Sequence, residues 1–265
     1  MSLESPKYTV SLAKAQGMID ETMALFALWN PGMTSAEMAN RAIQEGAFAR
    51  GTAKRIKDMV TEQFGPRFVG NGGRAGRQVK VLIESGCRAQ NLRQIFFLHT
   101  ARANAVLYDF VCEAYWPLYE AGRDSLGKTE ALNFLKIAAD NGRLSSRWSE
   151  IMMNRIASYL GGCLADFGLL ENSKRSPRRI LPFKIDRLMA LYLAHDIHFG
   201  GLSDNNVVDH RDWCLFGMKH SDVTRELQLV SNGHFIPQFS GDLVRISWQY
   251  KTLEEAFHAI CRAEL

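Results

Sequence analysis

Glycine and proline interrupt this sequence at short intervals, and the interruptions limit how long any one secondary-structure element can be. Asn30-Pro31-Gly32 follows an apolar-patterned segment from Thr9 to Trp29, and Gly46 and Gly51 bracket the connection after the next segment. Helices usually end at or near such residues. Between the interruptions, apolar residues recur at helical spacing. The sequence therefore predicts a mainly α fold: a helical bundle with two helix-turn-helix or winged-helix units and short β-hairpin wings.

Two short amphipathic segments near the N-terminus predict a first helix-turn-helix. Thr34 and Glu37 are three residues apart, as in a capping box, so a helix is expected to begin there and to run to about Glu45. A second helix is expected from about Thr52 to Phe64. Gly65-Pro66 is expected to end it, because proline removes a helical hydrogen bond and clashes with the preceding turn.

The outer face of this second helix is basic, and a recognition helix commonly has such a face. Many all-helical proteins contain a similar pair as plain packing helices, so both interpretations stay open. The glycine-rich stretch from Phe68 to Gly76 is expected to be a wing or a linker. The basic residues of this region that we assign to a DNA interface are Lys54, Arg55, Lys57, Arg74, Arg77 and Lys80.

A long helix is expected from Ala89 to Tyr115, closed by Trp116-Pro117. It is apolar on most faces, which is typical of the buried axis of a bundle. After it, the helix pair repeats, with a short helix from Thr129 to Asp140 and a longer one from Trp148 to Phe167. Ser145-Ser146 is expected to supply the N-cap of the longer helix.

A basic turn follows this second pair. Leu169-Leu170 and Arg179-Ile180-Leu181 flank a polar stretch from Asn172 to Pro177, a pattern that predicts a β-hairpin. Short helix, turn, long helix and hairpin, in this order, describe a winged helix-turn-helix. The last part of the chain offers a third winged-helix-like unit. Its elements are helices at Asp186–Phe199 and near Asp222–Ser231, a hairpin around Ser240-Gly241-Asp242 and a closing helix at Thr252–Arg262.

We therefore expect an N-terminal helical domain over residues 1–120, and one or more winged-helix domains with an acidic end over residues 121–265. The distribution of charge follows this organisation, although the whole chain carries a net charge of only +4. Residues 41–93 contain eleven basic and four acidic residues, and residues 171–185 contain five and one. Residues 186–265 contain seven basic and eleven acidic residues. Because polyanions are bound through local clusters of Lys and Arg, this partition favours a nucleic-acid partner.

Several classes of protein are disfavoured. No run of about 18 apolar residues could span a bilayer, and the N-terminus lacks the features of a secretory signal. The five cysteines (Cys87, Cys112, Cys163, Cys214 and Cys261) are odd in number and contain no CxxC pair, so we expect free thiols, no metal and a cytoplasmic protein. No catalytic signature occurs, and we expect neither an enzyme nor a cofactor.

Two histidine-containing segments are candidates for a catalytic or metal-binding site. His195 and His198 are three apart on an expected helix, which is a permitted spacing for a metal. Asp209-His210-Arg211-Asp212 could serve acid–base chemistry. Since neither has an identified further partner, we expect ordinary polar or capping histidines in the first segment and a salt-bridge cluster in the second.

Three parts of the chain resemble the BrxA family of bacterial BREX phage-defence systems. They are the opening from Tyr8 to Thr22, the helix pair with Arg41-Ala42 and Thr52–Ile56, and the segment from Ser146 to Leu170 with its basic turn. The resemblance implies a small, mainly helical cytoplasmic protein that binds double-stranded DNA and acts beside other BREX proteins. It also implies a partial likeness to the NusB transcription-antitermination fold.

Two functional hypotheses follow. In the first, the protein is a non-enzymatic DNA-binding protein, and the α-helical N-terminus at Ser145, Ser146 and Arg147 receives a phosphate. A cluster on the wing would grip the backbone alongside: Lys174, Arg175, Arg178 and Arg179. In the second, the helix-turn-helix shapes are docking surfaces of an assembly factor whose acidic end contacts a partner. RNA is a lesser possibility, raised by the NusB likeness alone.

Overall fold

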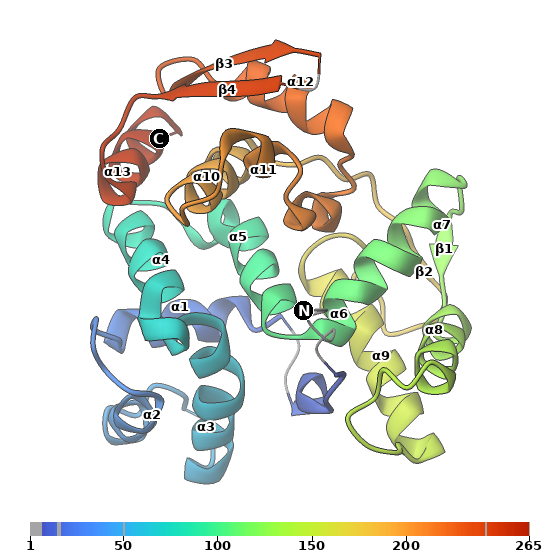
Figure 1. Cartoon of the computed structure of the whole chain (residues 1–265). Helices are drawn as coiled ribbons and strands as arrows, with labels where there is room; N and C mark the ends of the chain where they lie inside the picture. The colour runs from blue at the N-terminus through green and yellow to red at the C-terminus, as the bar shows by residue number, and fades with distance from the viewer. Residues whose placement is uncertain (1–6, 15–16, 50, 242, 265) are drawn as a thin grey trace. The chain divides into compact units, whose positions relative to one another are not determined.

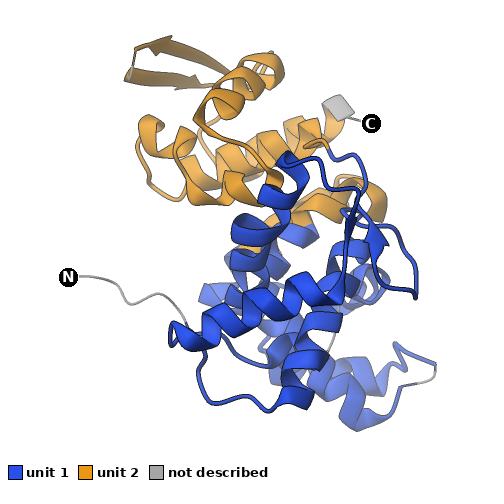
Figure 2. Cartoon of the chain, turned by 90° about the vertical axis from the view of Figure 1, so that its right-hand side faces the viewer, with its two compact units in different colours: residues 1–74, 96–183 blue, residues 75–95, 184–265 orange. Residues whose placement is uncertain are grey.

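The computed structural model describes residues 7–14, 17–49, 51–241 and 243–264. They form two compact units, which Figure 2 colours separately. Unit 1 comprises residues 1–74 and 96–183, and unit 2 comprises residues 75–95 and 184–265. Both units are mainly helical, as the sequence predicted. The division into domains at residue 120 stays a prediction.

The N-terminal part of unit 1 is a group of short helices around a cluster of phenylalanines. The ring of Phe26 lies 5.1 Å from Phe64, 4.9 Å from Phe68 and 6.4 Å from Phe96, between centroids. All four side chains are at most 1% exposed. Because each buried ring removes a large apolar area from water, this cluster stabilises the region. The elements are η1 (Ser11–Lys14), α1 (Ile19–Leu28), α2 (Ser35–Gln44), α3 (Ala53–Met59), the π-helical segment η2 (Val60–Val69) and η3 (Asn71–Gly73).

The predicted helix starts in this region are confirmed. The Thr34 hydroxyl accepts a hydrogen bond from the Glu37 amide at 3.2 Å, and the Glu37 carboxylate accepts one from the Thr34 amide at 2.8 Å. Thr52 caps α3 in the same way, by accepting from the Arg55 amide at 3.3 Å. These caps satisfy amide groups that would otherwise lack a partner at each helix start.

The predicted helix end at Gly65-Pro66 is wrong. The helix continues through Pro66 as η2 and ends only at Val69. In a π-helical turn the backbone hydrogen bonds span five residues instead of four. The helix can therefore continue through a proline, which has no amide hydrogen to donate. Gly65 packs closely on α2: a Cβ there would lie 2.4 Å from the Ser35 hydroxyl oxygen. The stretch expected to be a wing or linker, residues 68–76, is instead the end of η2, the short η3 and the start of α4.

The long helix predicted from Ala89 to Tyr115 is interrupted. Helix α5 ends at Arg102, and α6 begins at Ala105 after a break at Asn104. The buried Asn104 amide donates to the Thr100 carbonyl, and its oxygen accepts a hydrogen bond from the Ser11 hydroxyl at 2.9 Å. Trp116-Pro117 does not close the helix either, since proline is tolerated in the first turn of a new helix. The elements are α5 (Ala89–Arg102), α6 (Ala105–Phe110), η4 (Val111–Tyr115) and α7 (Trp116–Glu120).

The rest of unit 1 is a helix pair enclosed by short strands. Helices α8 (Lys128–Asp140) and α9 (Glu150–Asp166) are packed together, close to their predicted positions. Strand β1 (Ser125–Leu126) precedes α8 and pairs antiparallel with β2 (Arg178–Arg179). Leu170, after α9, forms an antiparallel bridge with Ile180. The chain after α9 therefore turns back, as predicted, but its returning strand has a second neighbour, β1, that the sequence pattern did not indicate.

Unit 2 confirms the predicted C-terminal elements. It contains most of α4 (Arg74–Glu84), α10 (Arg187–His198), α11 (Asp204–Val208), η5 (Arg211–Phe216), α12 (His220–Val230), the hairpin β3–β4 (Phe235–Ser240 and Leu243–Trp248) and α13 (Leu253–Glu264). Figure 1 shows the hairpin beside α12. The Thr252 hydroxyl accepts a hydrogen bond from the Glu255 amide at 3.2 Å, which confirms the expected start of α13.

The expectation of free thiols is wrong for two of the cysteines. Cys87 and Cys261 form a disulfide within unit 2, with their Cα atoms 6.4 Å apart and a sequence separation of 174. Their separation left no recognisable spacing motif. Cys112, Cys163 and Cys214 form no disulfide within the described residues. Among the described residues, none of the helices combines the length and apolarity needed to cross a membrane.

Candidate nucleic-acid interface

The loop between α8 and α9 holds three of the predicted contact residues. Ser145, Ser146 and Arg147 are exposed there, but they precede the helix by several residues. The N-cap of α9 is Ser149, whose hydroxyl accepts a hydrogen bond from the Met152 amide at 3.2 Å. The predicted cap at Ser145-Ser146 is therefore wrong. Ser149 lies directly between the buried Trp148 and the first residue of α9, Glu150.

The N-terminal segment of the chain fixes the start of this loop. The Tyr8 amide donates to the Arg143 carbonyl at 2.8 Å, and the Ser145 amide donates to the Tyr8 carbonyl at 2.9 Å. This parallel bridge joins residues more than 130 positions apart. Loop conformation here is consequently set by a long-range contact rather than by the local sequence.

An ion cluster around Arg143 also stabilises the junction between the N-terminal segment and the α8–α9 loop. The Arg143 guanidinium donates to both Glu113 oxygens, at 2.6 and 2.9 Å, and to Asp109. The Tyr8 hydroxyl donates to Asp109 at 2.9 Å, and Arg143 lies 4.9 Å from the centroid of the Tyr8 ring. Burial, and then the neighbouring Asp109 carboxylate, raise the pKa of Tyr8 above its usual value. Arg143 therefore supports the loop and is already engaged by carboxylates.

The basic turn (residues 171–177) is anchored at its base and exposed at its tip. The Glu171 amide donates to the Arg179 carbonyl at 2.8 Å, and the Ile180 amide donates to the Asp124 carbonyl at 2.8 Å. The Ser176 hydroxyl accepts from the Lys128 amide at 3.1 Å, which ties the turn to the start of α8. Lys174, Arg175 and Arg179 are exposed, and Arg178 is half-buried. The turn thus presents a concentration of positive charge beside the α8–α9 pair.

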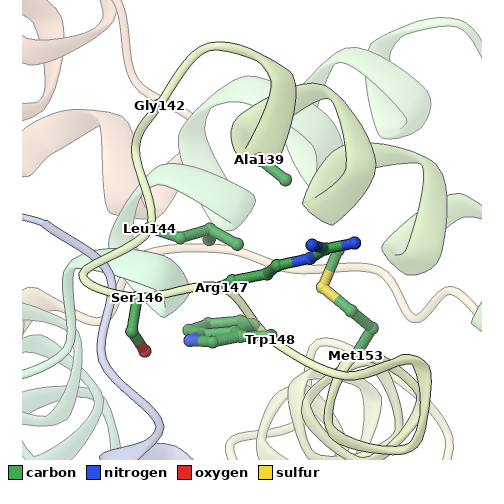
Figure 3. A pocket seen from close by; sticks show the side chains of 7 residues that line it. All are labelled: Ala139, Gly142, Leu144, Ser146, Arg147, Trp148 and Met153. Atoms are coloured by element: carbon green, nitrogen blue, oxygen red, sulfur yellow. The ribbon is translucent and has the colours of Figure 1, made fainter.

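A hollow of about 340 Å³ lies between the end of α8 and the start of α9. Its walls are mostly apolar, and Arg147 supplies its charge. Figure 3 shows the Arg147 side chain extending across the hollow toward Met153, above the Trp148 indole, with the Ser146 hydroxyl directed away from the guanidinium. The buried indole nitrogen of Trp148 has no hydrogen-bond partner among the described residues. The lining residues are Ala139, Gly142, Leu144, Ser146, Arg147, Trp148 and Met153.

The basic residues of the first helix pair form a separate surface. Lys54, Arg55 and Lys57 are exposed on α3. Figure 1 shows α3 and α8 at opposite sides of unit 1. The two basic clusters of unit 1 are therefore two surfaces rather than one patch.

The remaining predicted residues lie on helix α4, of which only the first three residues, 74–76, fall in the stretch that was expected to be a wing or a linker. Arg74 belongs to unit 1, whereas Arg77 and Lys80 belong to unit 2. Arg77 is exposed, but the Lys80 ammonium lies 3.7 Å from the Glu84 carboxylate and its side chain is only 16% exposed. Arg67, which was also counted in this basic segment, is buried at 5% exposure, and burial lowers its pKa to about 10. The accessible charge of this segment is accordingly smaller than its composition suggested.

Sequence reasoning missed the exposed face of α9. Ile151 is 83% exposed, and Arg155 and Ser158 follow it at helical spacing on the same side. The apolar residues that predicted this helix form its buried stripe, which includes Leu160 and Cys163, and the opposite side was not assigned a role. The available signal was an isoleucine outside that stripe in the first turn of a helix.

The two histidine-containing segments lie in unit 2. His195 is fully buried in α10, where its Nδ1 lies 2.8 Å from the Leu191 carbonyl, and burial lowers its pKa to about 4. His198 stacks on Trp248 with ring centroids 4.1 Å apart. His210 caps η5 by accepting from the Asp212 amide at 3.3 Å. In the described parts of the chain, no group of three His, Cys, Asp or Glu residues could hold a metal ion.

The fold and these surfaces define a mainly helical protein with two exposed basic clusters in unit 1. Its particular family follows from a sequence comparison: the BrxA family profile matches residues 6–196, well over half of the 265-residue chain, and the chain belongs to this family. That membership associates the protein with BREX phage defence and makes other BREX proteins plausible partners. A search of curated proteins finds no match.

Proposed function

We propose that this chain is a non-enzymatic, double-stranded DNA-binding component of a BREX system. The observation that carries the proposal is the order of elements around α8 and α9. Strand β1 precedes the helix pair. After α9, Leu170 forms a bridge with Ile180, and β2 pairs with β1. Such an order supports a winged helix, in which α9 is the recognition helix and the basic turn is the wing.

The charges around α9 support DNA as the ligand. Arg147 precedes the helix, while Lys174, Arg175 and Arg179 project from the wing. Lys and Arg bind phosphates and release condensed counterions, which supplies most sequence-independent affinity. In this proposal Arg147 and the wing contact the phosphate backbone on either side of the groove that α9 enters. Lys54, Arg55 and Lys57 on α3 form a second backbone contact, and Arg74 and Arg77 a minor one.

Salt dependence of duplex binding is the test. We expect a fluorescently labelled 30-base-pair duplex to bind, with an affinity that falls steeply as salt rises from 50 to 200 mM, because each phosphate contact contributes about 0.9 to the logarithmic slope. Single-stranded RNA of matched length should compete more weakly. Absence of duplex binding at low salt would reject the proposal, and stronger competition by RNA would transfer it to RNA.

A second candidate function is an assembly factor for other BREX proteins. It is favoured by the large apolar side chains exposed in unit 2, namely Leu202, Leu229, Ile236 and Leu243. Exposed apolar side chains of this kind are typical of surfaces that contact other proteins. Co-purification with another component, together with no retardation of duplex DNA at low salt, would favour this function over the first.

A further inference from the structure

The hollow between α8 and α9 has the size and lining of a small-molecule site. Its volume is about 340 Å³, and Figure 3 shows the apolar side chains of Ala139, Leu144 and Met153 around it. The flat Trp148 indole forms a further wall. Leu144 and Met153 are only half-buried, so apolar surface is accessible to solvent there. Pockets that bind small molecules are mostly apolar, contain a few polar groups and have volumes from about 300 Å³ upward.

The polar side chains of the hollow offer hydrogen-bond donors. Arg147 forms no hydrogen bond or ion pair with another described residue, whereas the guanidinium of Arg143, in the same loop, is held by Glu113 and Asp109. The indole N–H of Trp148 is buried and lacks an acceptor in the described part of the chain. Among the described residues, no carboxylate lines the hollow. A ligand with hydrogen-bond acceptors and a negative charge therefore complements it.

The frame of the hollow is held by contacts that leave its lining side chains available. The Tyr8 backbone bonds to Arg143 and Ser145 hold the start of the loop. Ser149 caps α9 at the end of the loop by accepting from the Met152 amide, and α8 and α9 pack directly on each other. Because the frame is already ordered, binding a ligand there carries a small entropic cost.

We propose that this hollow binds a small organic monoanion, in which a carboxylate is joined to a planar aromatic ring system. The carboxylate pairs with the Arg147 guanidinium, whose planar arrangement of donors matches its two oxygens. The rings lie against the apolar walls and the Trp148 indole. Arg147 is the one cation among the described lining residues, so the hollow matches a single negative charge rather than a polyphosphate. The site goes beyond the proposed function and does not depend on DNA binding.

A titration of the ¹⁵N-labelled full-length protein with 1-naphthoate tests the proposal. It is followed by NMR on the indole N–H signals of the five tryptophans, among which Trp148→Phe identifies the Trp148 signal. We expect the Trp148 signal to shift, with a dissociation constant on the order of 0.1–1 mM for a ligand of about 13 non-hydrogen atoms. The uncharged 1-naphthamide has the same shape and should bind about tenfold more weakly, because it lacks the charge-assisted pair. ATP should bind more weakly than naphthoate.

Two variants of equal net charge locate the anion. Arg147→Gln should weaken naphthoate binding about tenfold and leave naphthamide binding unchanged. Arg175→Gln removes an exposed arginine of the basic turn, outside the lining, and should bind naphthoate as the wild type does. Unchanged signals from the other tryptophans show that each variant is folded.

Three results would overturn the proposal. The first is that naphthoate leaves the Trp148 signal unshifted up to about 10 mM, a concentration about tenfold above the expected dissociation constant. The second is that naphthamide or ATP binds as tightly as naphthoate. The third is equal naphthoate binding by the wild type and Arg147→Gln. None of these results bears on duplex binding, so the proposed function stands or fails separately.

Discussion

Two regions of this protein share one order of elements and differ in how they are held and what they expose. In unit 1, α8 and α9 are followed by the short basic turn, and the junction is held by Arg143 with Asp109, Glu113 and the Tyr8 ring. In unit 2, α11 and α12 are followed by the hairpin β3–β4, whose Phe235 and Trp248 rings pack on the His195 ring. The first region exposes cations, and the second exposes Ile236 and Leu243.

The two edges of the hairpin β3–β4 differ in their backbone donors. Strand β4 has its outward amides occupied, since Val244 donates to Asn205 and Ile246 donates to Asp204. On β3, Pro237 removes a donor from the middle of the strand, which discourages pairing with another chain. The α8–α9 and α11–α12 regions therefore have a similar order of elements, and their exposed side chains determine which ligand each region could bind.

The largest expected effect is a loss of stability at acidic pH. Burial holds the pKa of His195 at about 4, whereas a histidine in the unfolded chain has a pKa near 6.5. As pH falls through this window the unfolded state binds a proton that the folded state excludes, so stability is lost from about pH 6.5 downward and the loss is complete below about pH 4. The loss should reach about 3 kcal/mol at pH 4.

Urea unfolding of wild type and His195→Leu at pH 7, 6, 5 and 4 measures this effect. The leucine variant should lack the histidine component of the pH dependence. His258→Gln, at an exposed histidine, is the control and should retain it. Identical pH profiles for wild type and the leucine variant would contradict the role of His195.

The ion cluster of unit 1 is expected to have the next largest effect. Arg143→Ala leaves Asp109, whose side chain is only 15% exposed, and Glu113 without their cation, and should cost about 2 kcal/mol of unfolding free energy at pH 7. Arg123→Ala removes a pair with Glu130 that is 3.5 Å long and more exposed, and should cost less than about 0.5 kcal/mol. Equal costs for the two variants would show that the cluster does not stabilise the junction.

Charge reversal tests which of the two regions contacts DNA. Glutamate at Lys174, Arg175, Arg178 and Arg179 should weaken duplex binding at least tenfold and reduce the salt slope, because about four phosphate contacts are lost. The matched variant in unit 2 carries glutamate at Arg225, Arg245, Lys251 and Arg262, all exposed, and has the same net charge. It should bind with nearly wild-type affinity in a mobility-shift assay. Equal weakening of both variants would indicate that total charge, rather than the wing, governs binding.

The smallest effect is expected at the apolar ends of the second hairpin. Ile236 and Leu243 are 64% and 71% exposed, so replacing both by serine should change the unfolding free energy by less than about 0.5 kcal/mol. Duplex affinity should also stay unchanged. A clear loss of DNA binding would extend the DNA interface into unit 2 and remove the contrast between the regions.

Local features predicted much of the fold correctly. The capping box at Thr34 and Glu37, the Thr52 cap and the alternating strands around Gly241 involve residues within a few positions of one another, and all three are confirmed. Family membership likewise followed from the sequence. For the candidate site, the basic turn could be predicted because its charges are adjacent in sequence, but the exposed face of α9 could not, because burial depends on which neighbours cover a helix.

What the sequence determined by itself is the helical class, most helix positions, the second hairpin and the segments in which positive charge gathers. Only the tertiary structure decided that the chain passes Pro66, breaks at Asn104, pairs β1 with β2, bridges Tyr8 to Leu144 and joins Cys87 to Cys261. The physical reason is the distance in sequence between the residues that interact. A cap or a turn is stabilised by atoms a few residues away, whereas these features exist because packing brings distant segments together and satisfies their buried polar groups.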